Sequence, residues 1–217
     1  MAWARELVGA VVSAALPGRC PGCGRAAEPV CATCASGLRR PPVLSPPPLV
    51  DGWVAAFAYE GVAREIVARL KYRNERAALP WLAAEMSAAL AERHPGGLPA
   101  VVTWAPASAL RLRRSGFDHG ELLARAVARE LALPVARLIA REPGPSQTGR
   151  SRADRAPGPP LRPAGAAAHG RAVLLVDDVV TTGATLSAAA AALRGAGATG
   201  VVALTAAATP MRPLLAV

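Results

Sequence analysis

The chain is poor in lysine, in aromatic side chains and in long apolar runs. Lys71 is its one lysine among 25 basic residues. Because Ala, Gly, Pro and Arg dominate the composition, we attach no functional meaning to the preference for arginine. Aromatic residues make up 4% of the chain, which argues against a surface that stacks nucleic-acid bases on aromatic rings. No apolar run approaches the roughly 18 residues that a membrane-spanning helix needs, so we expect no membrane span.

Acidic residues are also scarce. The chain has 15 of them and a net charge of +10, a surplus that favours polyanionic partners such as phosphorylated metabolites, nucleic acid or an anionic membrane. With 217 residues, of which 52% are hydrophobic, the chain is long enough for one full α/β domain and a small accessory module.

A clear export signal is missing as well. Residues 7–16 are apolar and follow Arg5, which loosely resembles a signal peptide, but Glu6 interrupts the basic region and Arg19 precedes Cys20. Apolar residues at helical spacing instead predict an amphipathic helix over residues 1–17, packed on the next module of a cytoplasmic protein. Export is the alternative.

The rest of the chain divides by composition and periodicity. We expect a cysteine-rich module at residues 18–40, a stiff proline-rich linker at 41–50 and the main domain at 51–217. Strands that alternate with helices indicate a mostly parallel α/β sheet. Residues 141–170 are rich in Arg, Pro and Gly and show no periodicity. The expected strands are 51–59, 100–105, 135–140, 172–176 and 200–206, and the expected helices are 62–70, 79–93, 118–131 and 184–195.

The strongest motif runs from Val173 to Thr185 and reads VLLVDDVVTTGAT. Its apolar start fits a strand that is buried on both faces. Two adjacent carboxylates, Asp177 and Asp178, come where we expect this strand to end, and a Thr/Gly loop then opens a helix. Open α/β sheets bind ligands at that end of their parallel strands.

Each part of this motif suits a phosphorylated sugar. The two carboxylates can accept hydrogen bonds from vicinal ribose hydroxyls, and Gly183 lets backbone N–H groups approach a phosphate closely. The helix N-terminus adds free N–H donors and a partial positive charge. An ordinary strand–helix turn with an incidental acid pair is the alternative. The loop residues that we assign to ligand binding are Val179, Thr181, Thr182, Gly183, Ala184 and Thr185.

This stretch resembles the phosphoribosyl-pyrophosphate signature of the type I phosphoribosyltransferases. The resemblance implies a Rossmann-like parallel sheet with a flexible hood. It also implies a catalytic role for Asp177 and Asp178, whose charge would stabilise an oxocarbenium-like ribose. Mg²⁺ that bridges pyrophosphate and ribose oxygens is a further implication.

All four cysteines lie in two C-x₂-C pairs, Cys20/Cys23 and Cys31/Cys34, separated by seven residues. Four thiolates at this spacing suit one tetrahedral, structural Zn²⁺. Two disulfides and an iron–sulfur site are the alternatives, and the weak export signal disfavours disulfides.

A Cys₄ module followed by a phosphoribosyltransferase-type domain resembles the ComF family of competence and DNA-uptake proteins over almost the whole chain. The supporting positions are Tyr59-Glu60-Gly61, Lys71-Tyr72, Pro106, Arg113 to Phe117, Gln147 and Arg152. The resemblance implies a hood at about 141–170. Together with the type I pattern, it implies ligand-binding roles for Lys71, Pro106, Arg113, Arg114, Gln147 and Arg152. Type I enzymes place their pyrophosphate loop after a strand, which corresponds to residues 105–108 here, and the arginines just after it, Arg111, Arg113 and Arg114, could hold phosphate oxygens. A basic loop that faces solvent is the alternative. For Lys71, an ordinary surface lysine is the alternative.

This chain departs from the family pattern at two places. The usual Arg-Gly-Phe-Asn-Gln reads Arg114-Ser115-Gly116-Phe117-Asp118-His119 here. We expect Asp118 to be a helix N-cap, with Glu121 completing a capping box. For His119, three interpretations stay open: it contacts the ligand, it acts as a base, or it has neither role. Arg155 stands where the family has Asn, so the usual substrate contacts of the hood do not transfer directly.

Two functions fit these observations. One is transfer of a 5-phosphoribosyl group between pyrophosphate and an unidentified acceptor, with Mg²⁺. The other is a non-catalytic factor that binds single-stranded DNA or a DNA-uptake protein and keeps the fold as a scaffold or sensor. The scarcity of aromatic residues ranks DNA contact below the binding of phosphoribosyl pyrophosphate or a related sugar phosphate.

Overall fold

The computed structural model describes residues 18–27, 29–41, 45–73, 76–94, 96–142, 158–165 and 167–209. The helix expected at residues 1–17 lies outside these ranges, as does part of the proline-rich linker. Within them, every helix is too short or too polar to cross a lipid bilayer.

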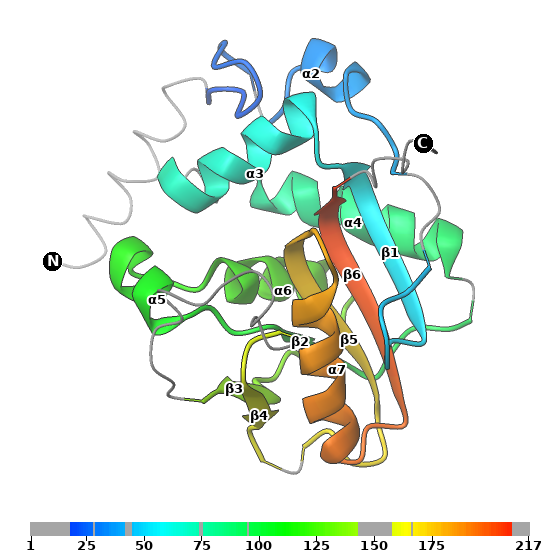
Figure 1. The fold of residues 1–217 in the computed structure, drawn as a ribbon. Coiled ribbons are helices and arrows are strands. Elements are labelled where there is room, and N and C mark those ends of the chain that lie inside the picture. Colours follow the sequence, from blue (N-terminus) through cyan, green and yellow to red (C-terminus); the bar gives the residue numbers. More distant parts are fainter. Residues whose placement is uncertain are drawn as a thin grey trace, which may run out of the picture.

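A four-stranded parallel sheet forms the centre of the main domain (Figure 1). Neighbouring strands are parallel throughout, which confirms the expected α/β class. The strands consist largely of Val, Ala and Leu, as is typical of parallel strands buried on both faces. In the order β1-β6-β5-β2, they are β1 (Gly52–Ala58), β6 (Gly200–Ala208), β5 (Ala172–Val180) and β2 (Val101–Trp104).

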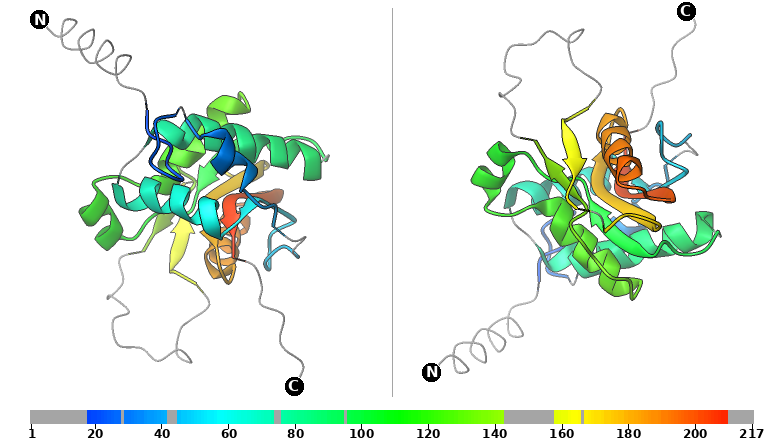
Figure 2. Two further views of the ribbon diagram at one scale, coloured as in Figure 1. Left: turned by 90° about the horizontal axis from the view of Figure 1, so that it is seen from above. Right: turned by 90° about the horizontal axis from the view of Figure 1, so that it is seen from below.

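Helices cover both faces of this sheet (Figure 1, Figure 2). Side chains alternate along β5, so Leu174 and Val176 belong to one core cluster while Val173 and Leu175 belong to the other. This alternation also decides which face each of the next two residues takes. The helices of the first cluster are α3 (Gly61–Arg73), α4 (Leu79–Arg93) and α6 (His119–Glu130), and that of the second is α7 (Ala184–Gly195).

Strand β5 is longer than the sequence pattern indicates. We expected it to end at residue 176, but β6 pairs with it as far as Val180, opposite Ala208. β2 stops at Trp104, opposite Val176. From Asp177 onward, β5 therefore has a strand neighbour on one side only, and the acid pair lies inside a strand beside an open edge.

The strand expected at residues 135–140 is wrong in its extent. Val135 makes one isolated parallel bridge to Val102, and the regular strand is β3 (Ile139–Arg141). β3 pairs antiparallel with β4 (Leu161–Pro163) in a separate small sheet. The apolar run is explained by burial of Leu138 and Ile139 in the core beneath α7, which needs no pairing with the main sheet.

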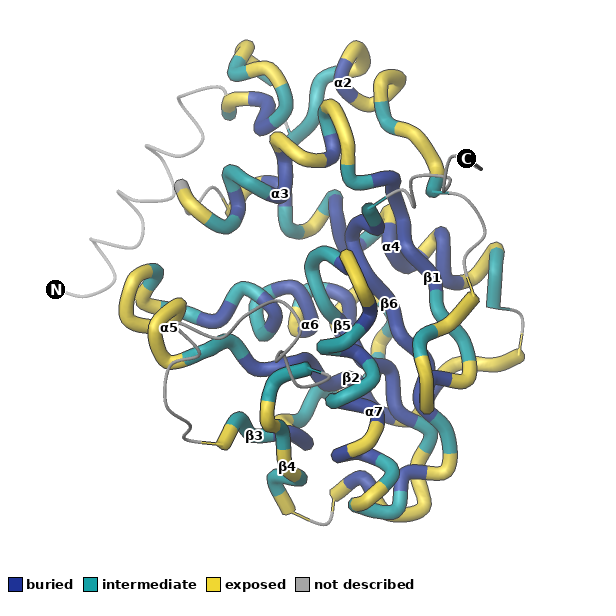
Figure 3. The backbone as a smooth tube through the Cα atoms, viewed as in Figure 1, coloured by how far each residue is buried: buried dark blue, intermediate teal, exposed yellow. Residues whose placement is uncertain are grey.

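A short helix that the sequence pattern did not indicate, α5 (Ala109–Ser115), follows β2. Ser108 caps its start by accepting a hydrogen bond from the Arg111 N–H, and Gly116 ends it in the left-handed conformation, with a φ of 77°. None of its residues is buried (Figure 3). α5 is thus an exposed helix next to the loop that we expected to bind pyrophosphate.

The cysteine-rich module packs on the start of α3 (Figure 1). It contains a short helix, α2 (Ala32–Ser36). A Cβ placed on Gly22 would lie 3.0 Å from Cγ1 of Val62 in α3 and 2.7 Å from Sγ of Cys34. Leu38 packs against the main core. The module and the main domain therefore share an apolar contact.

Candidate functional site

The turn between β5 and α7 builds one side of the site. Gly183 is the N-cap of α7, has a φ of 77° and offers no side-chain cap. The first turn of an α-helix leaves its N–H groups without intrahelical partners. In the described part of the chain, one side-chain acceptor reaches them: Thr182 Oγ1 lies 3.4 Å from the Ala184 nitrogen. The turn therefore presents N–H donors and a helix N-terminus, as the motif predicts.

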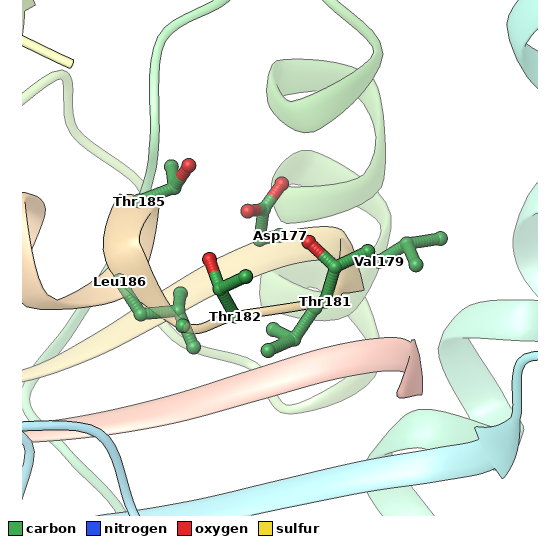
Figure 4. A pocket seen from close by; sticks show the side chains of 8 residues that line it. Asp177, Val179, Thr181, Thr182, Thr185 and Leu186 are labelled. Carbon is green, nitrogen blue, oxygen red and sulfur yellow. The ribbon is translucent and has the colours of Figure 1, made fainter. Parts of the chain in front are cut away.

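A small pocket that is open to solvent lies at this turn. The carboxylate of Asp177 and the hydroxyls of three threonines lie around it, whereas the side chain of Val179 points away (Figure 4). Val179 also packs partly against the core, and its N–H donates to Oδ1 of Asp178 at 2.6 Å. The threonines are Thr181, Thr182 and Thr185.

Asp177 is the acidic group of this pocket. Burial raises its pKa to about 7, and the charge of the neighbouring Asp178 acts in the same direction. The Asp178 N–H, 2.8 Å from Asp177 Oδ1, and the more distant charges of Lys71 and Arg111 lower the pKa again. A carboxyl with such a pKa is partly protonated near neutral pH, and a hydrogen-bond donor or cation in the pocket favours its ionised form.

Asp178 faces the opposite side of the sheet. Its Oδ1 lies 2.8 Å from Nζ of Lys71 in α3, and both side chains are mostly buried, with 13% and 19% of their surfaces exposed. From the sequence motif, we predicted the same role for both acids, as acceptors of hydrogen bonds from ribose hydroxyls. Strand alternation separates them, so Asp177 lines the pocket and Asp178 forms an ion pair. Lys71 is accordingly not the freely exposed surface lysine that was the alternative.

His119 lies beside this ion pair, at the start of α6. Burial lowers its pKa, the charge of Asp178 raises it, and the charge of Lys71 lowers it. Its Nε2 is buried and has no hydrogen-bond partner among the described residues. The ring meets Phe117 edge-on, with 4.8 Å between the centroids. The His119 ring thus lies near the acid pair, with Nε2 unpaired among the described residues.

Asp118 is the N-cap of α6, as expected. Its Oδ1 accepts hydrogen bonds from the N–H groups of Gly120 (3.0 Å) and Glu121 (3.4 Å). The carboxylate of Glu121 accepts two hydrogen bonds from Arg125, one turn further on, at 2.8 and 2.9 Å. The Glu121 carboxylate therefore pairs with Arg125 and does not complete the expected capping box.

Asp118 has a second role that the sequence did not reveal. Its Oδ2 accepts hydrogen bonds from the Ala107 N–H (2.8 Å) and from Nε1 of Trp104 (3.3 Å). The same buried carboxylate therefore ties the end of β2, the loop at 105–108 and the start of α6 together. This loop is the one at which the type I pattern places pyrophosphate.

The basic residues around this loop differ in their positions. Arg113 and Arg114 lie in the last turn of α5 and are exposed. Arg141 of β3, which the sequence analysis did not single out, donates from Nη1 to the carbonyl of buried Pro106 at 3.3 Å. No local pattern marked Arg141, because its partner is 35 residues away in the sequence. The other two predicted ligands, Gln147 and Arg152, lie outside the described residues.

The four cysteines come together as the spacing predicts. Their Sγ atoms all lie within 4.8 Å of one another, and none forms a disulfide. Tetrahedral Zn–S bonds of about 2.3 Å would place sulfurs about 3.8 Å apart, and Cys23 Sγ lies 3.7 Å from Cys31 Sγ. The sulfurs of Cys23 and Cys20 also face N–H donors, at 3.4 Å from Arg25 Nε and from the Cys31 N–H. This cluster is compatible with one tetrahedral metal ion.

Comparison with known families agrees with this geometry. The model of the phosphoribosyl transferase domain matches residues 118–214, somewhat less than half of the chain. The matched stretch contains α6, the acid pair and the turn into α7. The fold is an α/β domain with a parallel sheet, and residues 118–214 are similar to the phosphoribosyl transferase domain. No curated protein sequence matches the chain.

Several solved structures resemble part of the chain. The allosteric regulatory enzyme of purine biosynthesis is 21% identical over 59% of this chain, with a TM-score of 0.42. Glutamine phosphoribosylpyrophosphate amidotransferase from B. subtilis is 19% identical over 63%, with a TM-score of 0.45. The similar region spans 25% and 30% of those two proteins. For purine phosphoribosyltransferase from Pyrococcus horikoshii, the identity is 20%, the TM-score 0.37, and the coverage 56% of this chain and 71% of that protein.

Proposed function

We propose that this protein binds phosphoribosyl pyrophosphate, or a closely related sugar phosphate, together with Mg²⁺. One observation carries the proposal: the Asp177 carboxylate, three threonine hydroxyls and the N-terminus of α7 surround a single pocket. Phosphates bind readily at helix N-termini, and carboxylates accept hydrogen bonds from sugar hydroxyls. The fold-level match to phosphoribosyltransferase domains supports the same ligand.

In this proposal, the two ends of the pocket hold different parts of the ligand. The 5′-phosphate accepts hydrogen bonds from the amides and hydroxyls of residues 181–185, and the ribose hydroxyls donate to Asp177. Asp178, held by Lys71, adds negative charge behind the sugar. Both acids would stabilise positive charge that develops on the ribose when its bond to pyrophosphate breaks.

The carboxylate of Asp177 also suits Mg²⁺. Burial raises the pKa of Asp177, and a bound cation would favour its ionised form. Mg²⁺ prefers oxygen ligands from carboxylates and phosphates. When bound, Mg²⁺ would neutralise the oxygens of the pyrophosphate leaving group. Asp177 is the carboxylate that lines the pocket and would hold the ion.

We further propose that the chain is a ComF-like phosphoribosyltransferase with an unidentified acceptor, preceded by a structural Zn²⁺ module. The order of the Cys₄ cluster and the phosphoribosyltransferase-type domain supports this proposal. The segment at about 141–170 would act as the hood that receives the acceptor. A screen of nucleobases and amines for release of pyrophosphate would identify that acceptor.

Isothermal titration with phosphoribosyl pyrophosphate and Mg²⁺ tests the central proposal. We expect saturable binding by the wild-type chain and loss of that binding in an Asp177→Ala, Asp178→Ala double variant. A matched control is Glu121→Ala. This variant also removes a carboxylate, which pairs with Arg125 on the surface of α6, away from the pocket lining. Absence of binding at millimolar ligand, or equal binding by the double variant, would contradict the proposal.

A second function, contact with single-stranded DNA, is favoured by one feature. Helix α5 exposes three arginines and buries none of its residues. If α5 contacts phosphates, binding of an oligonucleotide should weaken steeply as salt rises, because counterions are released. Replacing Arg113 and Arg114 by Gln should reduce that salt dependence in a gel-shift titration. If the oligonucleotide is not retarded in the gel, or if its retardation does not change with salt concentration, this second function is wrong.

A further inference from the structure

Helix α3 has two buried stripes of side chains. Residues that are three or four apart lie on one face of a helix, and one such stripe belongs to the first core cluster. A second stripe, which begins one residue earlier, contains Ile66. This side chain has 2% of its surface exposed, yet it belongs to neither core cluster of the described residues. The first stripe consists of Ala63, Val67 and Leu70, and the second of Val62, Ile66 and Arg69.

The cysteine-rich module lies against the second stripe. A Cβ placed on Gly22 would lie 3.0 Å from Cγ1 of Val62, and one placed on Gly37 would lie 3.4 Å from Cγ2 of the same side chain. A Cβ on Gly24 would lie 3.8 Å from Nη2 of Arg69. The backbone of the module therefore approaches α3 at both ends of this stripe.

The cysteines are close to this contact. Gly22 lies between Cys20 and Cys23 in the chain, and its added Cβ would also lie 2.7 Å from Sγ of Cys34. Cys20 and Cys34 are buried. A metal ion held by the thiolates would fix the cysteine backbone on either side of Gly22. It would thereby fix the part of the module that approaches Val62.

The module is also attached to the main domain after its last cysteine. Leu38 packs against the main core. The Ala58 N–H, at the end of β1, donates a hydrogen bond to the carbonyl of Arg39 at 2.8 Å. The module thus contacts both α3 and the end of a sheet strand. Because it is attached at two places, it can restrain the position of α3 relative to the sheet.

The far end of α3 carries a group that depends on this position. Lys71 follows Arg69 by two residues, and its Nζ lies 2.8 Å from Oδ1 of Asp178 in β5. Both side chains are mostly buried. Separation of such a pair leaves a charge without compensation, and here that charge would lie next to Asp177, which lines the pocket. A shift of α3 would therefore be felt in the pocket.

We propose that the cysteine-rich module, with a metal ion bound, braces α3 so that Lys71 stays paired with Asp178, and that metal binding is thereby coupled to ligand binding in the sugar pocket. The coupling to a sugar phosphate rests on the proposed function, whereas the bracing of α3 does not. Such coupling is reciprocal, so a ligand that favours the paired state also favours metal binding.

The single lysine of the chain makes the bracing measurable. Because Lys71 is the only lysine, an amine-reactive ester labels this side chain and the N-terminal amine, and peptide mass spectrometry separates the two. The metal-loaded full chain is compared with the same chain after treatment with a chelator. We expect removal of the metal to speed labelling of Lys71 by roughly tenfold or more, because an ion pair that opens more often exposes its amine more often. An unchanged rate overturns the proposal.

A variant at the contact separates the bracing from metal binding itself. Val62→Asn places a polar group against the module and leaves the four cysteines in place. Labelling of Lys71 should accelerate, while elemental analysis still finds the metal. The matched control is Arg64→Asn, at an exposed position in the same turn of α3, which should label at the wild-type rate. Circular dichroism shows which preparations are folded, and if the chelated chain is unfolded, this pair of variants decides the question. Equal rates in both variants overturn the bracing.

The coupling is tested by isothermal titration with ribose 5-phosphate between pH 6 and 9. The charges of Lys71 and Arg111 lower the pKa of Asp177, whereas burial and the charge of Asp178 raise it. Removal of the metal should therefore move the pH at which binding reaches half its maximum upward, and weaken binding at pH 7 by up to roughly tenfold. In Lys71→Met, which lacks the pair already, removal of the metal should change the affinity by less than about twofold.

The outcomes separate this inference from the function on which its second half rests. If the metal-loaded wild type binds neither ribose 5-phosphate nor phosphoribosyl pyrophosphate, but removal of the metal still exposes Lys71, the proposed function is wrong and the bracing stands. If ribose 5-phosphate binds equally well with and without the metal, the coupling is overturned. An equal loss of affinity in the wild type and in Lys71→Met also overturns it, as does a purified chain that binds no metal.

Discussion

Nζ of Lys71 lies 2.8 Å from Oδ1 of Asp178, and this ion pair joins the end of α3 to the strand that carries both acids. Without it, two adjacent carboxylates would lie at one open strand edge with no cation within salt-bridge distance among the described residues. The ion pair also links α3, which contacts the cysteine-rich module, to the strand whose Asp177 lines the pocket.

Removal of the Lys71 charge should weaken ligand binding through Asp177. Lys71 lowers the pKa of Asp177, so Lys71→Met should raise that pKa and move the pH at which ligand binding reaches half its maximum upward. One pKa unit corresponds to about 1.4 kcal/mol, so we expect binding of ribose 5-phosphate at pH 7 to weaken by up to roughly tenfold. Titrations between pH 6 and 9 measure this shift. Lys71→Arg, which keeps the charge, should stay near wild type; an unchanged profile in Lys71→Met would count against the link.

The stability of the protein should depend on pH through Asp177. Its pKa is about 7 in the folded chain, against about 3.9 for an unfolded Asp. The folded state then holds an extra proton between about pH 4 and 7, so the free energy of unfolding falls as pH rises through that window. Asp177→Asn lacks this group. Urea unfolding at pH 5 and pH 8 should show a larger loss in the wild type than in Asp177→Asn, by more than about 1 kcal/mol; equal losses would contradict the raised pKa.

Gly183 should be sensitive to even the smallest added side chain. At a φ of 77°, a Cβ is strained, which costs about 1–2 kcal/mol. In addition, this Cβ would lie 2.8 Å from Cγ of Pro47 in the linker. Gly116→Ala is the matched control, because Gly116 has the same φ but no heavy atom within 4 Å of the added Cβ. Chemical unfolding should show a larger loss of stability for Gly183→Ala, and only that variant should lose binding of ribose 5-phosphate.

Asp118→Ala should destabilise the fold more than the loss of an ordinary helix cap. An N-cap alone contributes about 1 kcal/mol, whereas this change also leaves the N–H groups of Ala107 and Trp104 without their acceptor. Each buried, unpaired donor costs about 1–3 kcal/mol, so we expect a total loss above about 2 kcal/mol in urea unfolding. Ser108→Ala, which removes the exposed cap of α5, should cost less than about 1 kcal/mol. Similar losses in both variants would show that the tie to the loop contributes little.

The cysteine cluster should hold one Zn²⁺ per chain, measured by elemental analysis of the purified protein. A strong chelator should lower the melting temperature, because the free energy of metal binding contributes to folding of a module of this kind. Cys34→Ser should lose the metal, while Thr33→Ala, at the exposed neighbouring position, should keep it. A full-length protein with no bound metal, or with two disulfides, would disprove the zinc assignment.

Local patterns predicted the parts of the molecule that depend on neighbouring residues. The turn from β5 through Gly183 into α7 is one continuous stretch, and the cysteine pairs are separated by seven residues. The limits of α4, Leu79–Arg93, match the expected helix. In each of these cases, the residues that determine the structure lie within a few turns of one another, so their spacing is readable in the chain.

The arrangement of the site was decided by contacts between distant segments. Pairing with β6 extends β5 past Val176, and this extension turns Asp177 toward the pocket and Asp178 toward Lys71. The ties from Asp118 to Ala107 and from Arg141 to Pro106 also join separate elements. The amino-acid sequence by itself determined which chemical groups are present and which local turns carry them. Only the tertiary structure decided which groups meet, because hydrogen bonds and ion pairs between distant residues depend on how the sheet and helices pack.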